Sequence, residues 1–204
     1  MIVGVVGGIA GGKSAAAAAL AAATDGALIQ ADRLAHEALR EPSVRDAVAT
    51  KFGSGVLADD GDVDRKALAE RVFGPGAEKA AALEWLESVI HPRVRAAAEA
   101  MIRSVQAVDR DGMIVLDVPL LLEVGWASMC DRIVYVDTPR ELHLRLAASR
   151  GWTEEQLGDR EAKQWPLERK RAAASDVLAN AGTLEQLTAA ANLLAMKLLR
   201  LHLD

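Results

Sequence analysis

The feature that most constrains this chain is a glycine-rich segment near its start, Gly7–Ser14, which reads Gly-Gly-Ile-Ala-Gly-Gly-Lys-Ser. This matches the spacing G-x-x-x-x-G-K-[ST] of the phosphate-binding P-loop. An apolar run rich in β-branched residues, Ile2–Val6, precedes it and is typical of a buried strand. An alanine-rich run, Ser14–Ala23, follows it and favours a helix. Because a P-loop joins a strand to a helix, this order predicts a phosphate site rather than an ordinary glycine-rich turn.

The residue types of this segment suit a nucleoside triphosphate. Glycines allow backbone N–H groups to converge on an anion, and the start of a helix adds free N–H groups and a positive dipole end. Lys13 can reach the β- and γ-phosphates, and the Ser14 hydroxyl can coordinate Mg²⁺. The segment therefore predicts Mg²⁺ at Ser14 and a triphosphate held by a run of loop residues, namely Gly8, Ala10, Gly11, Gly12, Lys13, Ser14 and Ala15.

Composition narrows the class of protein. The 204 residues suffice for one well-buried core, and the net charge of −5 argues against a general nucleic-acid binder. The single cysteine, Cys130, excludes an internal disulfide and fits a reducing compartment. The apolar run after Lys13 lacks a basic leader and is too short to span a bilayer. We therefore expect a cytoplasmic protein without a membrane or nucleic-acid partner, as a monomer or small homo-oligomer.

Four further apolar runs resemble the first strand. They are separated by helical stretches, which is the pattern of a parallel sheet covered on both faces. The sequence therefore predicts an α/β fold with a five-stranded parallel sheet flanked by helices. The four additional strands are expected at Ala27–Gln30, Met113–Asp117, Arg132–Val136 and Asp176–Leu178.

The gaps between these strands divide a single predicted domain, 1–204, into a core and two excursions. The core comprises 1–42, 111–138 and 172–204. The gap after the second strand is too long for one crossover helix and predicts a helical insertion at about 43–110. Polar helices rich in Arg and Glu predict a lid at about 145–171, and Thr183 is expected to cap a final helix that ends near His202.

Within the insertion, helical patterns are separated by breaks at Gly74-Pro75-Gly76 and at Pro92. Because proline disrupts a helix interior, we expect one helix to end before Pro92 and another to begin there. His91 would then lie at a helix break with non-helical angles. The expected helices are Ser43–Phe52, Asp64–Phe73, Ala77–Ile90 and Pro92–Val105.

Several motifs beyond the P-loop occur in a specific order. An Ala-Asp pair with a His four residues after the Asp follows the second strand, an Ile-His-Pro occurs in the insertion, and D-x-P-L-L-x-E follows the third strand. With these motifs the chain resembles dephospho-coenzyme A kinases over essentially its whole length. The residues that carry the resemblance are Gly7–Ser14, Ala31, Asp32, His36, Asp64, Arg65, Leu68, Phe73, Ile90–Pro92, Asp117–Leu121, Glu123, Cys130, Asp131, Val136, Asp137, Arg160, Gln164, Asp176 and Asn180.

The resemblance implies transfer of the ATP γ-phosphoryl group to the ribose 3′-hydroxyl of dephospho-coenzyme A, the last step of coenzyme A synthesis. It implies a nucleotide-kinase-like core, a helical region that receives the acceptor, and a lid. Lys13 and Arg150 would assist catalysis, and Asn180 and Arg150 would contact ATP. Among the lid arginines, Arg160 is the next candidate after Arg150 for a phosphate contact. The alternative for most of these lid cations is an ordinary i,i+4 surface pair with a nearby glutamate.

Asp32 is the candidate catalytic base. It follows the second strand, at the edge where open α/β sheets hold ligands, and phosphoryl transfer to a hydroxyl needs a carboxylate that takes the proton. Its alternative role is to cap the helix Arg33–Leu39. Asp117 ends the third strand similarly and is a candidate for acceptor binding or for holding Mg²⁺ through water, or else a turn residue; Glu123 is a weaker candidate.

Two basic side chains of the insertion are candidates for acceptor binding. The resemblance favours His91, which would otherwise cap neighbouring backbone. The acceptor carries a pyrophosphate, onto which the guanidinium of Arg65 can fork, and the alternative is a solvated arginine on a helix face.

The chain also departs from the family pattern. Gln30 replaces a frequent Asp, so Asp32 is the only carboxylate there, and His143 stands near a usual Gln. Ala10 replaces a common glycine, which is acceptable if Ala10 keeps a negative φ. Ala15 replaces a frequent Thr, and the spacing from Arg145 to Arg150 is one residue longer than expected.

Two other functions remain open at this point. A nucleoside or nucleoside monophosphate kinase would share the loop, the sheet and the lid. A GTPase-like switch would need an N-K-x-D guanine motif, which does not occur in the sequence. Asp109–Gly112 does match D-x-x-G, but it precedes the third strand, whereas a γ-phosphate sensor should follow a strand end.

Overall fold

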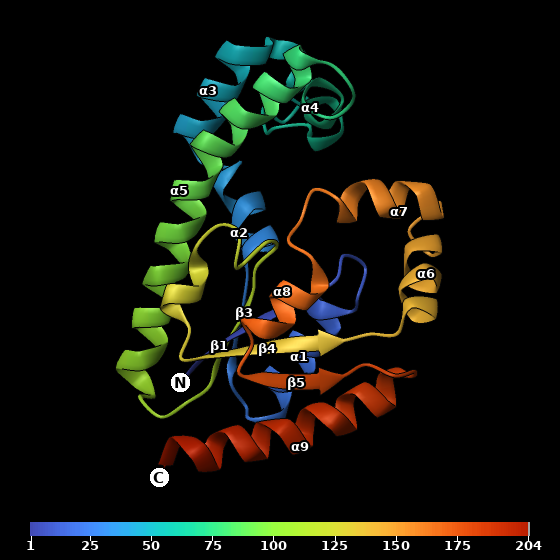
Figure 1. Cartoon of the computed structure of the whole chain (residues 1–204). Helices are drawn as coiled ribbons and strands as arrows, with labels where there is room; N and C mark the ends of the chain where they lie inside the picture. Colours follow the sequence, from blue (N-terminus) through green and yellow to red (C-terminus); the bar gives the residue numbers. More distant parts are fainter. Residues whose placement is uncertain (204) are drawn as a thin grey trace. The chain divides into compact units, whose positions relative to one another are not determined.

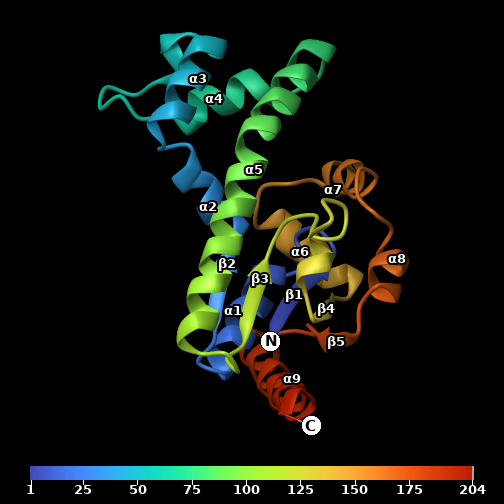
Figure 2. The ribbon, with the colours of Figure 1, turned by 90° about the vertical axis from the view of Figure 1, so that its left-hand side faces the viewer.

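A parallel sheet forms the centre of the computed structural model, which describes residues 1–203. Its strands are β1 (Ile2–Gly7), β2 (Ala27–Gln30), β3 (Ile114–Asp117), β4 (Arg132–Asp137) and β5 (Asp176–Ala179). They lie side by side in the order β2-β3-β1-β4-β5, and all four pairings are parallel (Figure 2). The predicted α/β fold and five-stranded parallel sheet are confirmed.

Two compact units make up the chain, and each is described by itself. The sheet unit consists of Met1–Gln30 and Ile102–Asp204, and the helical unit consists of Ala31–Met101. The insertion was expected at about 43–110, so the helical unit begins and ends earlier in the sequence than that range. Within residues 1–203, no helix is both long and apolar enough to cross a membrane.

In the sheet unit, β1 is buried on both faces. On one face Val3 and Val5 pack in a core with α1 (Lys13–Ala23) and α9 (Leu184–Leu203), which runs along the sheet (Figure 1). On the other face, a Cβ on Gly4 would meet Leu121 and Cys130, so this glycine lets the segment after β3 pack directly on the strand. The small alanine side chains of α1 allow this helix to pack closely on the Leu and Val side chains of the core.

The helices that follow β3 agree closely with the pattern of the sequence. A short 3₁₀ helix, η2 (Trp126–Met129), occupies the gap between β3 and β4. After β4 come α6 (Arg140–Ala148), α7 (Glu154–Glu161) and α8 (Leu167–Ala172), the last of which the sequence pattern did not predict. Capping boxes start two helices, because Thr153 and Gln156 pair at α7, and Thr183 and Gln186 pair at α9.

The helical unit contains α2 (Ala31–Ala38), α3 (Pro42–Phe52), the 3₁₀ helix η1 (Ser54–Val56), α4 (Arg65–Val72) and most of α5 (Ala77–Val108). Pro42 begins α3 as its first residue, and the Asp64 carboxylate caps α4 by accepting from Lys66 N and Ala67 N. Both helices therefore lie where the sequence predicts them.

The predicted helix break at Pro92 is wrong. Pro92 lies inside α5, which is one helix of 32 residues. Proline in a helix interior costs about 3 kcal/mol through its missing N–H and its ring. The helix continues because Ile90, Val94 and Ala98 bury one face at a four-residue spacing. Packing along a long helix here outweighs the local effect of one proline.

Candidate active site

The P-loop lies between β1 and α1, at the carboxyl end of the central strand. Open α/β sheets bind ligands at the point where the strand order reverses, and this point is β1, because β3 lies on one side of β1 and β4 on the other. Gly12 adopts φ 77°, in the left-handed region, and Lys13 begins the helix. The Gly11 N–H donates to the Gly8 carbonyl at 3.1 Å, and the Lys13 ammonium donates to the same carbonyl at 2.8 Å. Lys13 is thus folded back over its own loop.

Ala10 does not keep the negative φ on which its acceptability depended. Its φ is +55°, a conformation that costs a residue with a Cβ about 1–2 kcal/mol. Burial offsets this strain, because Ala10 is 4 % exposed and packs in a cluster with Ala147 and Leu157. Alanine is small enough to satisfy both the backbone and the cluster.

Asn180 holds the loop from the end of β5. It is buried, and its side-chain amide donates to the Gly11 carbonyl at 3.2 Å and to the Thr138 hydroxyl at 3.3 Å. The Thr138 hydroxyl donates to the same Gly11 carbonyl at 2.8 Å. Sequence reasoning found Asn180 but missed Thr138, which carries no local signal because its partner lies 127 positions away.

Lys13 has four charged neighbours in the sheet unit. Burial lowers the pKa of Lys13 to about 8; Lys170 and Arg150 add to this effect, while Asp117 and Glu123 oppose it. Asp117 ends β3 in register with Gln30 of β2. Of the predicted site residues, Arg150 and Asp117 thus lie close enough to Lys13 for their charges to influence its pKa.

Glu123 is committed to an ion pair. Its carboxylate lies 3.0 Å from the ammonium of Lys170, which is 3 % exposed, and it accepts from Trp165 N at 3.0 Å. The Lys170 ammonium also donates to the Gln164 amide oxygen at 2.8 Å. Burial raises the pKa of Glu123, but the hydrogen bonds and the Lys170 charge outweigh it and leave that pKa below its usual value. Glu123 therefore fastens the chain between α7 and α8.

Several lid cations already have partners. Arg140 forms two hydrogen bonds with the Glu161 carboxylate, Arg160 stacks on Trp152 at 4.4 Å, and Arg171 pairs with Asp137 at 2.8 Å. Arg150 lies in the turn after α6 at 5.7 Å from the Trp152 ring, and its side chain is exposed. Arg160 is also exposed and lies closer to the same ring, so Arg150 is the less tightly stacked of the two.

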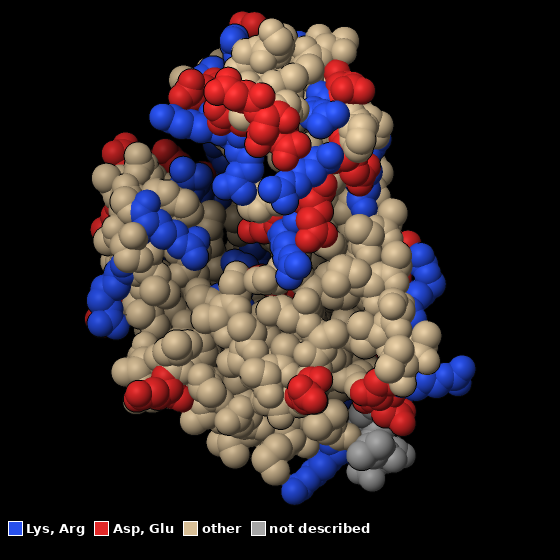
Figure 3. Space-filling model, turned by 180° about the vertical axis from the view of Figure 1, so that it is seen from behind, with Lys and Arg blue, Asp and Glu red and all other residues tan. Residues whose placement is uncertain are grey.

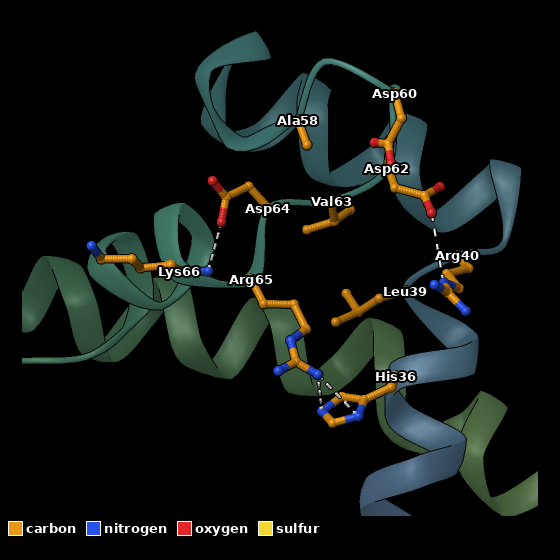
Figure 4. A pocket seen from close by; sticks show the side chains of 10 residues that line it. All are labelled: His36, Leu39, Arg40, Ala58, Asp60, Asp62, Val63, Asp64, Arg65 and Lys66. Carbon is orange, nitrogen blue, oxygen red and sulfur yellow. Dashed lines mark hydrogen bonds and ion pairs between the residues drawn. The ribbon is translucent and has the colours of Figure 1, made fainter.

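In the helical unit, Arg65 and His36 line the same pocket and contact each other. Arg65, the first residue of α4, points toward α2, and its guanidinium lies 3.2 and 3.0 Å from the two ring nitrogens of His36 (Figure 4). The pocket encloses about 610 Å³, within the range of small-molecule sites. Its lining residues are His36, Leu39, Arg40, Ala58, Asp60, Asp62, Val63, Asp64, Arg65 and Lys66.

Charges of both signs crowd this unit, as the space-filling view shows (Figure 3). The acidic side chains of the pocket serve the fold: Asp64 caps α4, Asp60 accepts from Asp62 N, and Asp62 lies 3.6 Å from Arg40. Arg65 forms no ion pair with a carboxylate in the part of the chain that the structure describes. The pocket thus contains a guanidinium that no carboxylate pairs with among the described residues.

The two remaining predicted residues of this unit are exposed on helices. Asp32 lies in the first turn of α2, two residues after β2 ends. A carboxylate at this position also interacts favourably with the positive end of the helix dipole. His91 lies within α5 and not at a helix break, so its expected non-helical conformation is wrong.

The Asp109–Gly112 segment has a structural role. The Asp109 carboxylate accepts from Asp111 N at 3.2 Å and from Gly112 N at 2.9 Å, which closes the turn before β3. A carboxylate used in this way explains the D-x-x-G match without a nucleotide-sensing function.

Oxygen donors suited to Mg²⁺ are present at the loop. The Ser14 hydroxyl is exposed in the first turn of α1, and the Asp117 carboxylate is half-buried at the end of β3. Among the described residues, no group of three or more His, Cys, Asp or Glu side chains could hold an ion. This donor set fits Mg²⁺, which binds through one or two side chains together with substrate phosphates and water.

The comparisons with known proteins agree on one family. The family model described as dephospho-CoA kinase matches residues 1–186. A dephospho-CoA kinase of Rhodopirellula baltica is 36 % identical over 162 residues, which cover 79 % of this chain and 74 % of the relative. Among solved structures, TT1252 from Thermus thermophilus has a TM-score of 0.73 at 32 % identity, with 97 % of both chains covered. Dephospho-CoA kinase from Campylobacter jejuni, at 24 % identity, shares the fold with a TM-score of 0.70 over 98 % of this chain and 97 % of that one.

Proposed function

The chain belongs to the dephospho-CoA kinase family, and we propose that it transfers the γ-phosphoryl group of ATP to the ribose 3′-hydroxyl of dephospho-coenzyme A. This reaction completes coenzyme A and makes the chain a phosphotransferase. The observation that supports the proposal is the P-loop between β1 and α1, with Lys13 at the start of α1 donating to the Gly8 carbonyl of the loop. Expectations of a cytoplasmic location and of a monomer or small homo-oligomer stay predictions.

The loop and its neighbours would bind the donor. Backbone N–H groups of the loop would hold the phosphates, and the Lys13 ammonium would leave the Gly8 carbonyl for the β- and γ-phosphates. Arg150 would neutralise charge that develops during transfer. Asn180 would act on ATP mainly through its hold on Gly11.

Mg²⁺ would be held by the Ser14 hydroxyl, with Asp117 acting through water. When bound, it would supply positive charge that offsets the negative charge of the phosphates. Orientation of the phosphates, neutralisation of further charge and removal of the acceptor proton would fall to the side chains of this chain.

The helical unit would receive the acceptor. Arg65 has no carboxylate partner among the described residues, and its planar guanidinium suits a pyrophosphate. Asp32 would orient the ribose hydroxyl and take its proton, a role supported by its exposure and its position directly after β2. His91, which is exposed on α5, is the less strongly supported acceptor residue.

A coupled assay tests the function directly. ATP turnover is measured with dephospho-coenzyme A and, separately, with a panel of nucleosides and nucleoside monophosphates. We expect dephospho-coenzyme A to be phosphorylated with the highest kcat/KM by at least tenfold. Equal or faster phosphorylation of a panel compound would instead favour the nucleoside-kinase alternative.

Substitution of Asp32 tests the proposed base. Asp32→Asn should lower kcat by about 10²–10⁴-fold with little change in the KM for ATP, because general-base catalysis contributes about this factor. Lys13→Ala should abolish turnover. Asp46→Asn, an exposed carboxylate on α3, provides the control and should leave kcat unchanged. Near-normal kcat in Asp32→Asn would exclude this base.

A further inference from the structure

The imidazole of His143, on α6, lies against the P-loop. The three atoms nearest to a Cβ built on Gly8 all belong to this ring, with Nε2 at 2.9 Å and Nδ1 at 3.1 Å. A Cβ on Gly11 would lie 2.7 Å from Nε2. The ring therefore occupies space that a side chain at either position would need, and it limits where the loop can move.

One nitrogen of this ring has no partner. His143 is 2 % exposed, and its Nε2 is buried without a hydrogen bond in the described part of the chain. Its Nδ1 lies 4.0 Å from the Glu161 carboxylate of α7, which is already held by Arg140 of α6. A buried polar atom without a partner requires an explanation, because most such atoms in folded proteins are satisfied.

The surroundings of the ring favour its neutral form. Burial lowers the pKa of His143, as do Arg140 on its own helix and Lys13 on α1, while Glu161 opposes them. A neutral imidazole has one N–H donor, which either nitrogen can carry. Nε2 is therefore able to donate to a carbonyl of the loop if that carbonyl becomes free.

The Gly8 carbonyl is such an acceptor. It accepts from Lys13 at 2.8 Å and from Gly11 N at 3.1 Å, so both of its lone pairs are used. When Lys13 turns to phosphate, one lone pair of the Gly8 carbonyl becomes free on the side of the loop where the ring lies, since a Cβ built on Gly11 would meet both Nε2, at 2.7 Å, and the Gly8 carbonyl oxygen, at 2.8 Å. We propose that His143 is a positioning residue of the nucleotide site, whose Nε2–H takes over the Gly8 carbonyl when Lys13 binds phosphate. This inference rests on the proposed nucleotide site at the loop.

The test compares substitutions that keep or remove the donor. His143→Gln retains an amide donor at similar reach, whereas His143→Phe keeps a planar ring of similar bulk and removes both nitrogens. We expect His143→Phe to raise the KM and the calorimetric dissociation constant for ATP by about tenfold, the equivalent of one hydrogen bond of about 1.4 kcal/mol. His143→Gln should stay within about threefold of wild type. The KM for dephospho-coenzyme A should not change in either variant, and Glu141→Gln, exposed on the same helix, is the control.

Equal ATP constants for the Gln and Phe variants would overturn the proposal, as would a loss of kcat with unchanged ATP binding. Gly8→Ala keeps it testable if a His143 variant fails to fold. The Cβ of the Gly8→Ala variant should displace the ring and weaken ATP binding. In a His143→Ala background, Gly8→Ala should weaken ATP binding only slightly. Additive effects of the two substitutions would contradict the proposed contact. Calorimetry with ATP alone separates this result from the proposed function, which fails only if wild type binds ATP but does not phosphorylate dephospho-coenzyme A.

Discussion

Residue 10 shows how a single side chain can satisfy two opposing demands. The loop requires a left-handed backbone at φ +55°, which favours glycine, while the surrounding cluster of Leu157 and Ala147 favours an apolar side chain. Alanine contributes one buried methyl group, worth about 0.8 kcal/mol, at a backbone cost of similar size. The residue is therefore close to an energetic balance, and any larger side chain disturbs it.

We expect Ala10→Gly to change the free energy of unfolding by less than about 1 kcal/mol, because relief of backbone strain offsets the lost methyl contact. Ala10→Val should lower it by at least about 2 kcal/mol, since a β-branched side chain is poorly tolerated at positive φ and overpacks the cluster. Urea unfolding of both variants measures the difference. A Val variant as stable as wild type would mean that the loop can adopt another conformation.

At the scale of elements, the carboxylate of Asp176 joins β5 to two neighbours. It lies 2.8 Å from Lys197 of α9 and 3.8 Å from Arg132 of β4, and it accepts from the Ser175 hydroxyl at 3.0 Å. Burial raises the pKa of Asp176, but these partners outweigh it and leave that pKa below its usual value. The contribution of Asp176 to the free energy of unfolding is therefore fully present above the pKa of an unfolded aspartate, about 3.9. It is lost as pH falls through the lower pKa that Asp176 has in the folded protein.

Asp176→Asn should accordingly lower the free energy of unfolding by about 2 kcal/mol at pH 7, because it removes the charge that strengthens the hydrogen bonds from Lys197 and Ser175 to this buried carboxylate. The gap between wild type and variant should narrow below about pH 4, where wild type also becomes protonated. Urea titrations at pH 7, 5 and 3.5 measure both. Glu185→Gln, exposed on α9, is the control, and a gap that is constant with pH would contradict the assignment.

The elements that could be predicted from the sequence are those set by local patterns. All five strands follow from apolar β-branched runs, and the starts of α3, α7 and α9 follow from Pro42, Thr153 and Thr183. The contacts of Lys170 with Glu123 and of His143 with Gly8 join distant parts of the chain, so no local pattern signals them. The P-loop was predictable because its residues are contiguous in the sequence. Asn180, which supports the loop, was expected only from the family resemblance, and the supporting side chains of Thr138 and His143 carry no local signal.

Pro92 is the clearest case in which a local rule loses to packing. We expect Pro92→Ala to raise the free energy of unfolding by about 1–2 kcal/mol, since it restores one backbone N–H and removes the clash of the ring, less the entropy gained by the unfolded chain. Thermal unfolding measures the shift. If Pro92 instead ended one helix and began another, as the sequence predicts, Pro92→Ala would remove that break and lower the free energy of unfolding.

At the scale of the whole molecule, the chain separates two kinds of task. The sheet unit carries the P-loop with Lys13, Asp117 and Arg150, and the helical unit carries the pocket with Arg65 and His36. If donor and acceptor bind to different units, substitutions in each unit should affect one substrate only. This division is accessible to experiment without knowledge of how the two units are arranged.

Arg65→Ala should raise the KM for dephospho-coenzyme A by about 10- to 100-fold, because loss of a charge-assisted hydrogen bond costs about 1.5–3 kcal/mol, and it should leave the calorimetric dissociation constant of ATP unchanged. Arg65→Lys should recover only part of this loss, since an ammonium cannot form the planar fork of a guanidinium. Arg71→Ala is the matched control, because Arg71 is exposed on the same helix and does not line the pocket. Weaker ATP binding in Arg65→Ala, or an unchanged KM for the acceptor, would show that the helical pocket does not receive dephospho-coenzyme A.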